Sequence, residues 1–342
     1  MLDVQPLDPA TAPEPVLAGY HALRAAVVAA DRPEDPPLTC QDTIGRLRTP
    51  ATEDGTCRVW TGHLDGRLAG AVRIALPPVP NHGIVKVEIH VHPGLRRRGF
   101  GTELLRAALP VLRDSGRATV FGLPVTPGSA GARWAAQLGF AVTHRTVTQA
   151  LSVATTSPQL WDVPVPTGYR LAHWTGRTPE LFVDSYAVAR QAAQDAPHGR
   201  ASLRATADWT PSRIRARERE AAAAGIEQRV VIAVENATHR VAGVHVVQQD
   251  GFRPELALVE ETAVSAAHRG RGLRPAMTAA MLRWITDERP ELARLLATTA
   301  ASDTGLLALH QALGYRTTRE TDWVETATAN LVEQLAVPAG VH

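Results

Sequence analysis

Three consecutive arginines, Arg96, Arg97 and Arg98, stand beside Gly99 and Gly101 where a strand-like pattern changes into an aliphatic, helix-like run. The first N–H groups of a helix have no partner within it, and the helix dipole adds partial positive charge there. Glycines let an anion approach the backbone, and arginines supply charge-assisted hydrogen bonds. The loop therefore predicts an anion site that suits a pyrophosphate. The alternative is a solvated arginine turn at a glycine helix start.

The spacing of this loop does not match the two common nucleotide motifs. The third glycine of G-x-G-x-x-G is missing, and the loop is not a G-x-x-x-x-G-K-[ST] sequence. Binding of NAD and simple nucleotide hydrolysis are therefore not favoured.

The strand before the loop, `VKVEIHVH`, alternates apolar and ionisable residues. Lys86, Glu88, His90 and His92 share one face, opposite the valines and isoleucine. A strand between neighbouring elements seldom carries four ionisable groups on a dry face, so this face should line a cleft or meet solvent. Because the strand ends at the anion loop, Glu88 and His90 are predicted to lie beside the bound anion, where a base is useful. An exposed sheet face with incidental charges is the alternative.

The same junction occurs twice in the chain. A shift of 173 residues places `GRLAGAVRI` (66–74) over `HRVAGVHVV` (239–247), and it also places Val91 over Val264. With a two-residue adjustment, `AAQLGF` (135–140) falls over `HQALGY` (310–315). Several matches in one order indicate a tandem duplication.

Each repeat predicts the same series of elements, which makes the fold class mixed α/β with a mixed sheet. A hairpin is expected around Asp65-Gly66 in the first repeat and around `ENATHRVAG` (235–243) in the second. The elements that follow are listed by residue number: strands at 84–91 and 256–264, helices at 101–115 and 273–288, strands at 118–123 and 293–299, and a short helix ending in Leu-Gly-aromatic.

The length of 342 residues suits two domains of roughly 150 residues each. The segment 157–168, `SPQLWDVPVPTG`, is rich in proline, which interrupts helices and central strands. The predicted domains are residues 1–157 and 169–342, joined by a linker at 158–168.

The composition excludes several classes of function. Apolar residues make up 44% and charged residues 20%, as in ordinary globular proteins. A formal charge of +2, with the arginines spread out, gives no reason to expect nucleic acid or a membrane as partner. Two cysteines argue against a disulfide framework and a multi-cysteine metal site, and there is no leader pattern or long apolar run. We expect a cytoplasmic protein without a metal.

These features together resemble the GCN5-related N-acetyltransferase superfamily, whose acetyl-CoA signature is [QR]-x-x-G-x-[GA] after the fourth strand. The segment 96–101, `RRRGFG`, matches every fixed position. The second copy, `RGRGLR` at 269–274, matches the first two and departs at Arg274. The resemblance covers nearly the whole chain, which looks like the tandem-domain acetyltransferases of actinobacterial type.

The resemblance implies an acetyl-CoA-dependent N-acetyltransferase that acts on a primary amine of a small molecule in a ternary complex. The N–H of Val91 would face the thioester oxygen, Glu88 would be the base, and His90 would be second to it. The residues expected to bind the cofactor are Ile89, Val91, Arg96, Arg97, Arg98, Gly99, Phe100, Gly101 and Thr102 in the first repeat, and Val264, Arg269, Gly270, Arg271 and Gly272 in the second.

One residue of the family pattern is missing. Many members place a tyrosine five positions before the final aromatic residue, where it protonates the leaving thiolate. Here that position holds Ala135 in the first repeat and His310 in the second. The first repeat is favoured as the catalytic one, and Glu261, which aligns with Glu88, makes the second repeat the alternative. A scaffold that binds acyl-CoA without turnover is the alternative function. The sequence sets neither the acceptor amine nor an oligomeric state.

Overall fold

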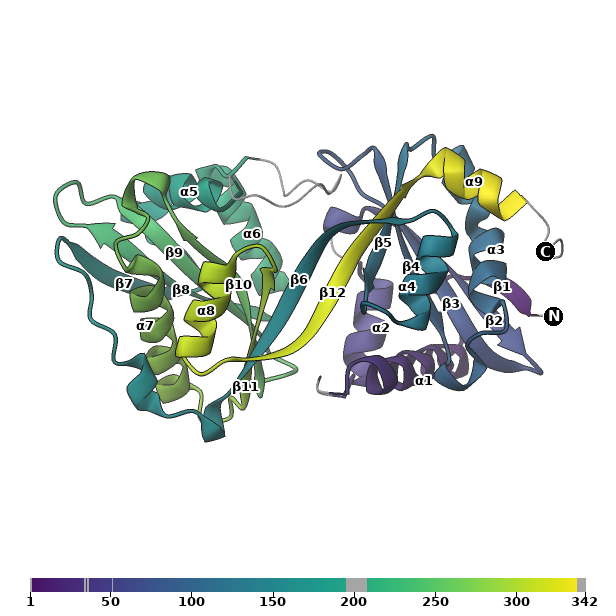
Figure 1. The fold of residues 1–342 in the computed structure, drawn as a ribbon, viewed down its shortest axis with the longest axis horizontal. Helices are drawn as coiled ribbons and strands as arrows, with labels where there is room; N and C mark the ends of the chain where they lie inside the picture. The colour runs from purple at the N-terminus through teal and green to yellow at the C-terminus, as the bar shows by residue number, and fades with distance from the viewer. Residues whose placement is uncertain (1, 34, 36, 51, 195–207, 337–342) are drawn as a thin grey trace. The chain divides into compact units, whose positions relative to one another are not determined.

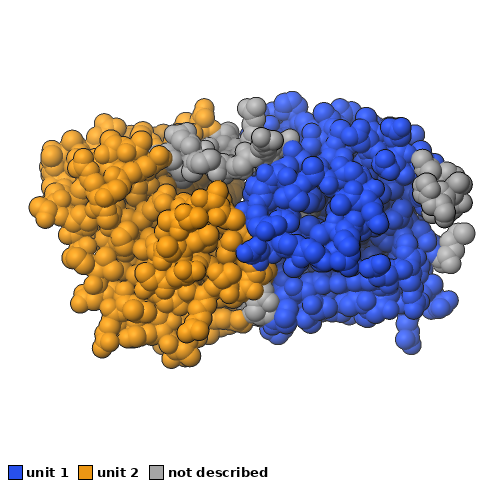
Figure 2. Space-filling view, in the orientation of Figure 1, with its two compact units in different colours: residues 1–145, 199–206, 320–342 blue, residues 146–198, 207–319 orange. Residues whose placement is uncertain are grey.

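The computed structural model describes residues 2–336, except for 34, 36, 51 and 195–207 (Figure 1). These residues form two compact units (Figure 2). Unit 1 contains residues 2–145 and 320–336 of the described chain, and unit 2 contains residues 146–194 and 208–319. Each unit is a mixed sheet with helices on both faces, which confirms the predicted fold class.

In unit 1 the strands follow one another across the sheet in the order β1 (Asp3–Leu7), β2 (Thr56–Leu64), β3 (Arg67–Leu76), β4 (Ile84–Val91), β5 (Thr119–Val125) and β12 (Arg316–Ala327). The β4–β5 pair is parallel, and the other pairs described in this unit are antiparallel. Helices α1 (Glu14–Asp31) and α2 (Cys40–Arg48) cover one face, and α3 (Phe100–Asp114) and α9 (Thr328–Ala336) cover the other. Helix α4 (Ala130–Gln137) follows β5.

Unit 2 repeats this plan with β7 (Tyr169–Thr175), β8 (Ile226–Glu235), β9 (Val241–Asp250), β10 (Leu256–Val264), β11 (Arg294–Ala300) and β6 (Ala141–Ser152). Helices α5 (Glu180–Gln194) and α6 (Pro211–Ala223) pack on one face, and α7 (Leu273–Glu288) packs on the other. Helix α8 (Thr304–Ala312) follows β11. Short 3₁₀ turns lie at η1 (Thr52–Asp54), η2 (Pro93–Leu95), η3 (Val153–Thr155), η4 (Pro158–Trp161) and η5 (Ala266–His268).

The register of the strands confirms the tandem duplication. Gly70 on β3 is opposite Val91 on β4, and Gly243 on β9 is opposite Val264 on β10. These two pairs are related by the same 173-residue shift that the sequence predicts. The strands at 84–91 and 256–264, and the helices that follow them, lie where the sequence places them to within one residue.

Each unit receives its last strand from the other repeat. Strand β12, at the end of the second repeat, runs antiparallel to β5, with Glu325 opposite Phe121. Strand β6, at the end of the first repeat, runs antiparallel to β11, with Leu151 opposite Leu295. The compact units therefore differ from the contiguous halves 1–157 and 169–342, because the repeats exchange these strands. The repeat boundary stays a prediction.

The proline-rich segment 158–168 is partly packed into unit 2. Trp161 is only 2% exposed, and its Nε1–H donates to the Leu313 carbonyl at 3.0 Å. Pro158 begins the turn η4, and Pro164 and Pro166 lie in irregular chain before β7, while Trp161 anchors the segment to the core.

None of the described helices has both the length and the apolar character needed to cross a bilayer. In the same part of the chain, no set of three or more His, Cys, Asp or Glu side chains is arranged around a potential metal position.

Candidate functional site

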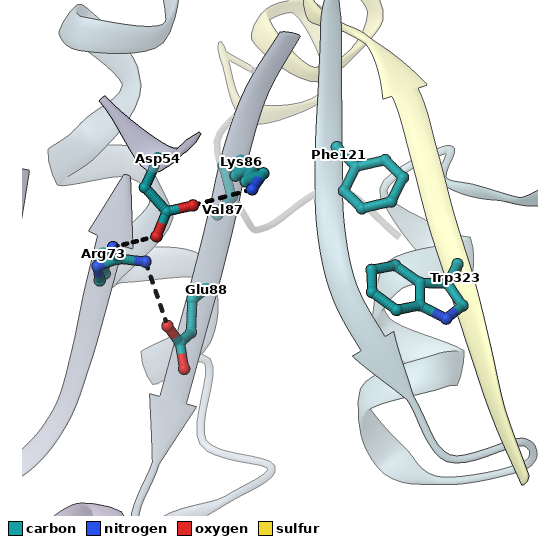
Figure 3. A pocket seen from close by; sticks show the side chains of 7 residues that line it. All are labelled: Asp54, Arg73, Lys86, Val87, Glu88, Phe121 and Trp323. Carbon is teal, nitrogen blue, oxygen red and sulfur yellow. Dashed lines mark hydrogen bonds and ion pairs between the residues drawn. The ribbon is translucent and has the colours of Figure 1, made fainter. Parts of the chain in front are cut away.

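The first feature of the site is a gap between β4 and β5. The two strands pair from Ile84 opposite Thr119 to Val87 opposite Gly122, and the ribbons then diverge (Figure 3). The His92 N–H donates to the carbonyl of Ala69 on β3 at 2.8 Å. Because backbone groups alternate sides along a strand, the N–H and C=O groups of Ile89 and Val91 face the gap. An extended molecule can pair with this edge.

The loop that follows β4 has the backbone of an anion site. Gly99 adopts a left-handed φ of +82° as the N-cap of α3, and Arg97 is also left-handed, with φ of +66°. The Thr102 N–H donates to the Gly99 carbonyl at 2.9 Å, so the N–H groups before it lie at the open end of the helix. Arg97, Arg98 and Gly99 are exposed, and a Cβ on Gly99 would meet nothing within 4 Å. The loop is open to an anionic ligand.

Arg96 has a different place from its two neighbours. Its Nη1 and Nη2 donate to Asp31 Oδ1 and Oδ2 at 2.7 and 2.8 Å, and its Nε donates to the Val91 carbonyl at 3.2 Å. The guanidinium therefore ties the end of β4 to the end of α1. Direct contact of Arg96 with a pyrophosphate stays a prediction.

The remaining loop residues are held by packing. Phe100 is buried in the core under α3. The Thr102 hydroxyl accepts a hydrogen bond from Trp134 Nε1 at 3.0 Å. A Cβ on Gly101 would make an ordinary van der Waals contact with the Trp134 ring at 3.6 Å, so alanine, which the signature also allows, would fit here.

Glu88 and His90 come together on the polar face of β4, with 2.6 Å between His90 Nε2 and Glu88 Oε1. Arg24 on α1 contacts both side chains, and Arg73 Nη1 lies 3.8 Å from Glu88 Oε2. Burial raises the pKa of Glu88, but His90 and Arg24 outweigh this effect and hold the pKa well below its usual range. Burial lowers the pKa of His90, against the opposing effect of Glu88. At pH 7 the pair consists of a carboxylate and a neutral imidazole.

Sequence reasoning missed Arg24. A signal for it exists, because the pattern Tyr-x-x-x-Arg occurs on the first helix of both repeats, as Tyr20 and Arg24 and again as Tyr186 and Arg190. Arg190 Nε lies 2.7 Å from Glu261 Oε2, and its Nη1 donates to the Tyr186 hydroxyl at 3.1 Å. Each repeat therefore holds its strand carboxylate with an arginine from the preceding helix.

The carboxylate of the second repeat has a different environment. Burial raises the pKa of Glu261 to about 7, although Arg190 opposes this shift. The position that corresponds to His90 holds Ala263, which is 4% exposed. Strands β10 and β11 also part early, since their pairing ends at Val259 opposite Ala297. Unit 2 thus has the gap but lacks the histidine.

The loop of unit 2 keeps the backbone form of the first loop. Gly270 and Gly272 are both left-handed, with φ of +75° and +77°, and Arg269 Nε donates to the Val264 carbonyl at 3.3 Å. Arg271 is exposed. At the departure from the signature, Arg274 Nη1 donates to Asp303 Oδ2 at 3.3 Å. The next residue is a proline, which removes one N–H from the start of α7.

The two residues at the family's tyrosine position lie in the interior. His310 is 1% exposed, its Nδ1 lies 3.1 Å from Gln149 Oε1, and burial lowers its pKa to about 4. Ala135 is 5% exposed. At pH 7 His310 is neutral and Ala135 has no ionisable group, so neither position presents a protonated side chain as general acid.

A cavity of about 170 Å³ lies beside Glu88, where β4 and β5 begin to part (Figure 3). It is lined by Asp54, Arg73, Lys86, Val87, Glu88, Phe121 and Trp323. Asp54 joins two of the cations, with Oδ2 2.6 Å from Arg73 Nη2 and Oδ1 2.9 Å from Lys86 Nζ. Trp323 could not be found by reading the first repeat, because it lies on the exchanged strand β12.

Known proteins resemble this chain in sequence and in fold. The model of the GNAT acetyltransferase family matches residues 23–140, which lie in the first repeat. Mycothiol acetyltransferase from Salinispora arenicola is 30% identical over 284 residues, covering 80% of this chain and 82% of that protein. A tandem GNAT protein from the clavulanic acid biosynthesis pathway is 27% identical, with a TM-score of 0.77 over 96% of this chain and 99% of its own. A GCN5-related N-acetyltransferase from Sphaerobacter thermophilus, 18% identical, has the same fold, with a TM-score of 0.71 over 96% of each chain. The chain therefore belongs to the GNAT acetyltransferase family.

Proposed function

We propose that the protein transfers the acetyl group of acetyl-CoA to a primary amine of a small molecule, by direct attack in a ternary complex formed in unit 1. The observation that carries this proposal is the contact between Glu88 and His90 at the gap between β4 and β5. Family membership supports the acetyl transfer, and the acceptor class and the choice of unit are our own inference.

The donor fits the described backbone. The outward N–H and C=O groups of Ile89 would pair with the amide groups of the pantetheine arm, and the backbone of Val91 would lie beside its thioester end. The helix N-terminus at Gly99, together with the exposed Arg97 and Arg98, would hold the pyrophosphate. The Val91 N–H would then face the thioester oxygen and stabilise the negative charge that develops on it.

The acceptor must lose a proton before or during its attack. Glu88 is ionised and attracts the ammonium form of the amine, while His90, neutral and in contact with Glu88, can accept the proton. Glu88 then stabilises the imidazolium that results. Because Ala135 supplies no acid, CoA leaves as its thiolate in this proposal.

Unit 1 is the better candidate for catalysis because its signature is complete and its carboxylate has a histidine partner. Unit 2 has Ala263 in place of His90, and its loop carries Arg274 and Pro275. We propose that unit 2 contributes fold stability rather than turnover. A protein that binds acyl-CoA without turnover is the competing function.

The test uses the purified full chain with acetyl-CoA and a panel of primary amines. We expect release of the CoA thiol together with a product heavier by one acetyl group in mass spectrometry. Initial rates measured against both substrates should give intersecting lines, as a ternary complex requires. CoA binding without product from any amine would overturn the proposal in favour of the scaffold, and parallel lines would indicate an acetylated enzyme instead.

A further inference from the structure

The cavity beside Glu88 contains more charge than the fold needs. By strand register, Arg73 corresponds to Val246 of unit 2. Lys86 corresponds to Leu258, one residue away from the 173-residue shift, because β10 has a bulge between Val259 and Glu261. By the same comparison, Phe121 corresponds to Leu296. Unit 2 builds the same sheet with three aliphatic side chains at these positions. The charged and aromatic groups of unit 1 are therefore not required by the architecture, which suggests that they serve a ligand.

The charges around the cavity do not cancel. Three cations, Arg24, Arg73 and Lys86, face two carboxylates, Asp54 and Glu88. His90, Tyr20 and Cys57 are neutral at pH 7, since burial lowers the pKa of His90 and raises the pKa values of Tyr20 and Cys57. Arg32, which also acts on His90, is paired with Asp35 at 3.5 Å. One positive charge is left over, in a setting where these side chains are only 13–21% exposed. An anionic group on the ligand would compensate it, whereas a polyamine would add to the excess.

The charged side chains lie together on one wall of the cavity (Figure 3). Arg73 lies between the two carboxylates, toward Asp54 on one side and toward Glu88 on the other (Figure 3). The opposite wall is formed by the aromatic rings of Phe121 and Trp323, whose centroids lie 5.4 Å apart. Trp323 is in turn stacked on His144 at 5.3 Å, which fixes the wall in place.

We propose that the acceptor is an aminocarboxylate, such as a free amino acid, and that Arg73 and Lys86 select it by binding its carboxylate. The hydrocarbon part lies along Phe121 and Trp323, and the amine points toward Glu88. This inference rests on the proposed function of unit 1. In the reaction, the ammonium gives one proton to the Glu88–His90 pair and becomes a neutral amine, whose nitrogen forms a bond to the acetyl carbon. The carbon–sulfur bond breaks, CoA leaves as thiolate, and the second proton lost by the nitrogen passes to water as the amide forms.

The experiment compares amino acids with their own amides, which keep the amine and the side chain but lack the negative charge. Phenylalanine and phenylalaninamide form one pair, leucine and leucinamide a second, and spermidine is the polyamine probe. kcat/KM is measured for the wild-type chain and for Lys86→Leu, which copies the second repeat. Arg67→Gln, which removes an exposed arginine at the start of β3, is the matched control for loss of one cation.

We expect the wild-type chain to prefer the acid over the amide by about tenfold to hundredfold, the usual scale of a charge-assisted hydrogen bond. Lys86→Leu should lose most of this preference through a loss on the acid alone, and Arg67→Gln should retain it. Lys86→Gln repeats the test if the leucine variant does not fold, with CoA affinity as the check on folding. Equal use of acid and amide, preference for spermidine, or an equal loss on both substrates in the Lys86 variants would overturn the inference.

A binding measurement separates this inference from the proposed function. Calorimetry of each acid and amide with the full chain saturated with CoA requires no turnover. Selective binding of acids without any product would support the carboxylate site and overturn the acetyltransferase proposal. Product formed equally from acids and amides would support the acetyltransferase proposal and overturn the carboxylate site. If the chain shows no binding and forms no product, both proposals are overturned.

Discussion

Glu88 and Glu261 occupy the same strand position in the two repeats, and each is held by an arginine from the preceding helix. Their pKa values nevertheless move in opposite directions, because burial is outweighed by His90 and Arg24 at Glu88 and prevails at Glu261. Glu261 also has one oxygen, Oε1, without a hydrogen-bond partner among the described residues. One backbone thus supports two protonation states, and the neighbouring side chains decide between them.

The largest expected effect comes from exchanging these two carboxylates for amides. Glu88→Gln should lower kcat/KM by about 100-fold to 10,000-fold, because it removes the charge that attracts the ammonium and supports His90. Glu261→Gln should change it by less than about threefold, because unit 2 does not turn over in our proposal. Both are measured at saturating acetyl-CoA across pH. A large loss only in Glu261→Gln would transfer catalysis to unit 2, and small losses in both would leave His90 or water as the proton acceptor without help from the carboxylate.

A smaller effect is expected from the two loops. Gly99→Glu should weaken CoA binding by about tenfold to hundredfold, because the new carboxylate enters the open space where the pyrophosphate would lie. Gly99→Ala controls for backbone strain at the left-handed φ, and it should weaken binding several-fold less. Gly272→Glu makes the same change in unit 2 and should leave turnover intact. Calorimetry with CoA measures the affinities, and unchanged binding in Gly99→Glu would remove the first loop as the principal site.

The smallest expected effect concerns the stability of unit 2 in acid. Burial lowers the pKa of His245 to about 3 and that of His310 to about 4. Both are neutral in the folded chain but take up protons near pH 6.5 when unfolded. Their contribution is therefore complete above pH 6.5 and is lost as the pH falls toward 4 and 3, with a slope of at most about 1.4 kcal/mol per pH unit for each histidine. Glu261 acts in the opposite direction. Because its pKa is raised, it adds to the stability of the folded chain as the pH falls from about 7 to 4.5, and this offsets the loss from one histidine.

Thermal unfolding followed by circular dichroism between pH 7.5 and 4.5 checks this expectation. His245→Gln should flatten the loss of Tm on acidification, whatever its effect at pH 7.5. His239→Asn, at an exposed turn of the same unit, is the control and should follow the wild-type curve. Identical pH slopes for His245→Gln and the wild-type chain would refute the assignment.

The sequence predicts local features of this protein well. Alternation places Glu88 and His90 on one face, and this face does become the polar wall beneath α1. The glycines at 99 and 272 mark helix starts because both need a left-handed backbone, which glycine adopts without strain. Such signals depend only on neighbours in the chain.

Contacts between distant segments account for what the sequence does not predict. The bond from Arg96 to Asp31, and the approach of Arg24 to Glu88, depend on how α1 packs against the sheet. The exchange of β6 and β12 is harder still to predict, because the two strands end equivalent repeats and either one can pair with β5 or β11 through main-chain hydrogen bonds. For this reason neither the limits of the units nor Trp323 in the cavity wall follows from the repeat pattern.

The exchanged strands also affect the order in which the chain can fold during synthesis. Strand β5 is complete at Val125, but its partner β12 begins only at Arg316, so more than half of the chain must leave the ribosome before this pair can form. Until then β5 keeps one open edge, which is a template for pairing with other chains. Unit 2 has its exchanged strand much earlier, because β6 precedes the rest of that unit. The repeat made first is therefore the one finished last, and its cavity closes only when the C-terminal strand arrives.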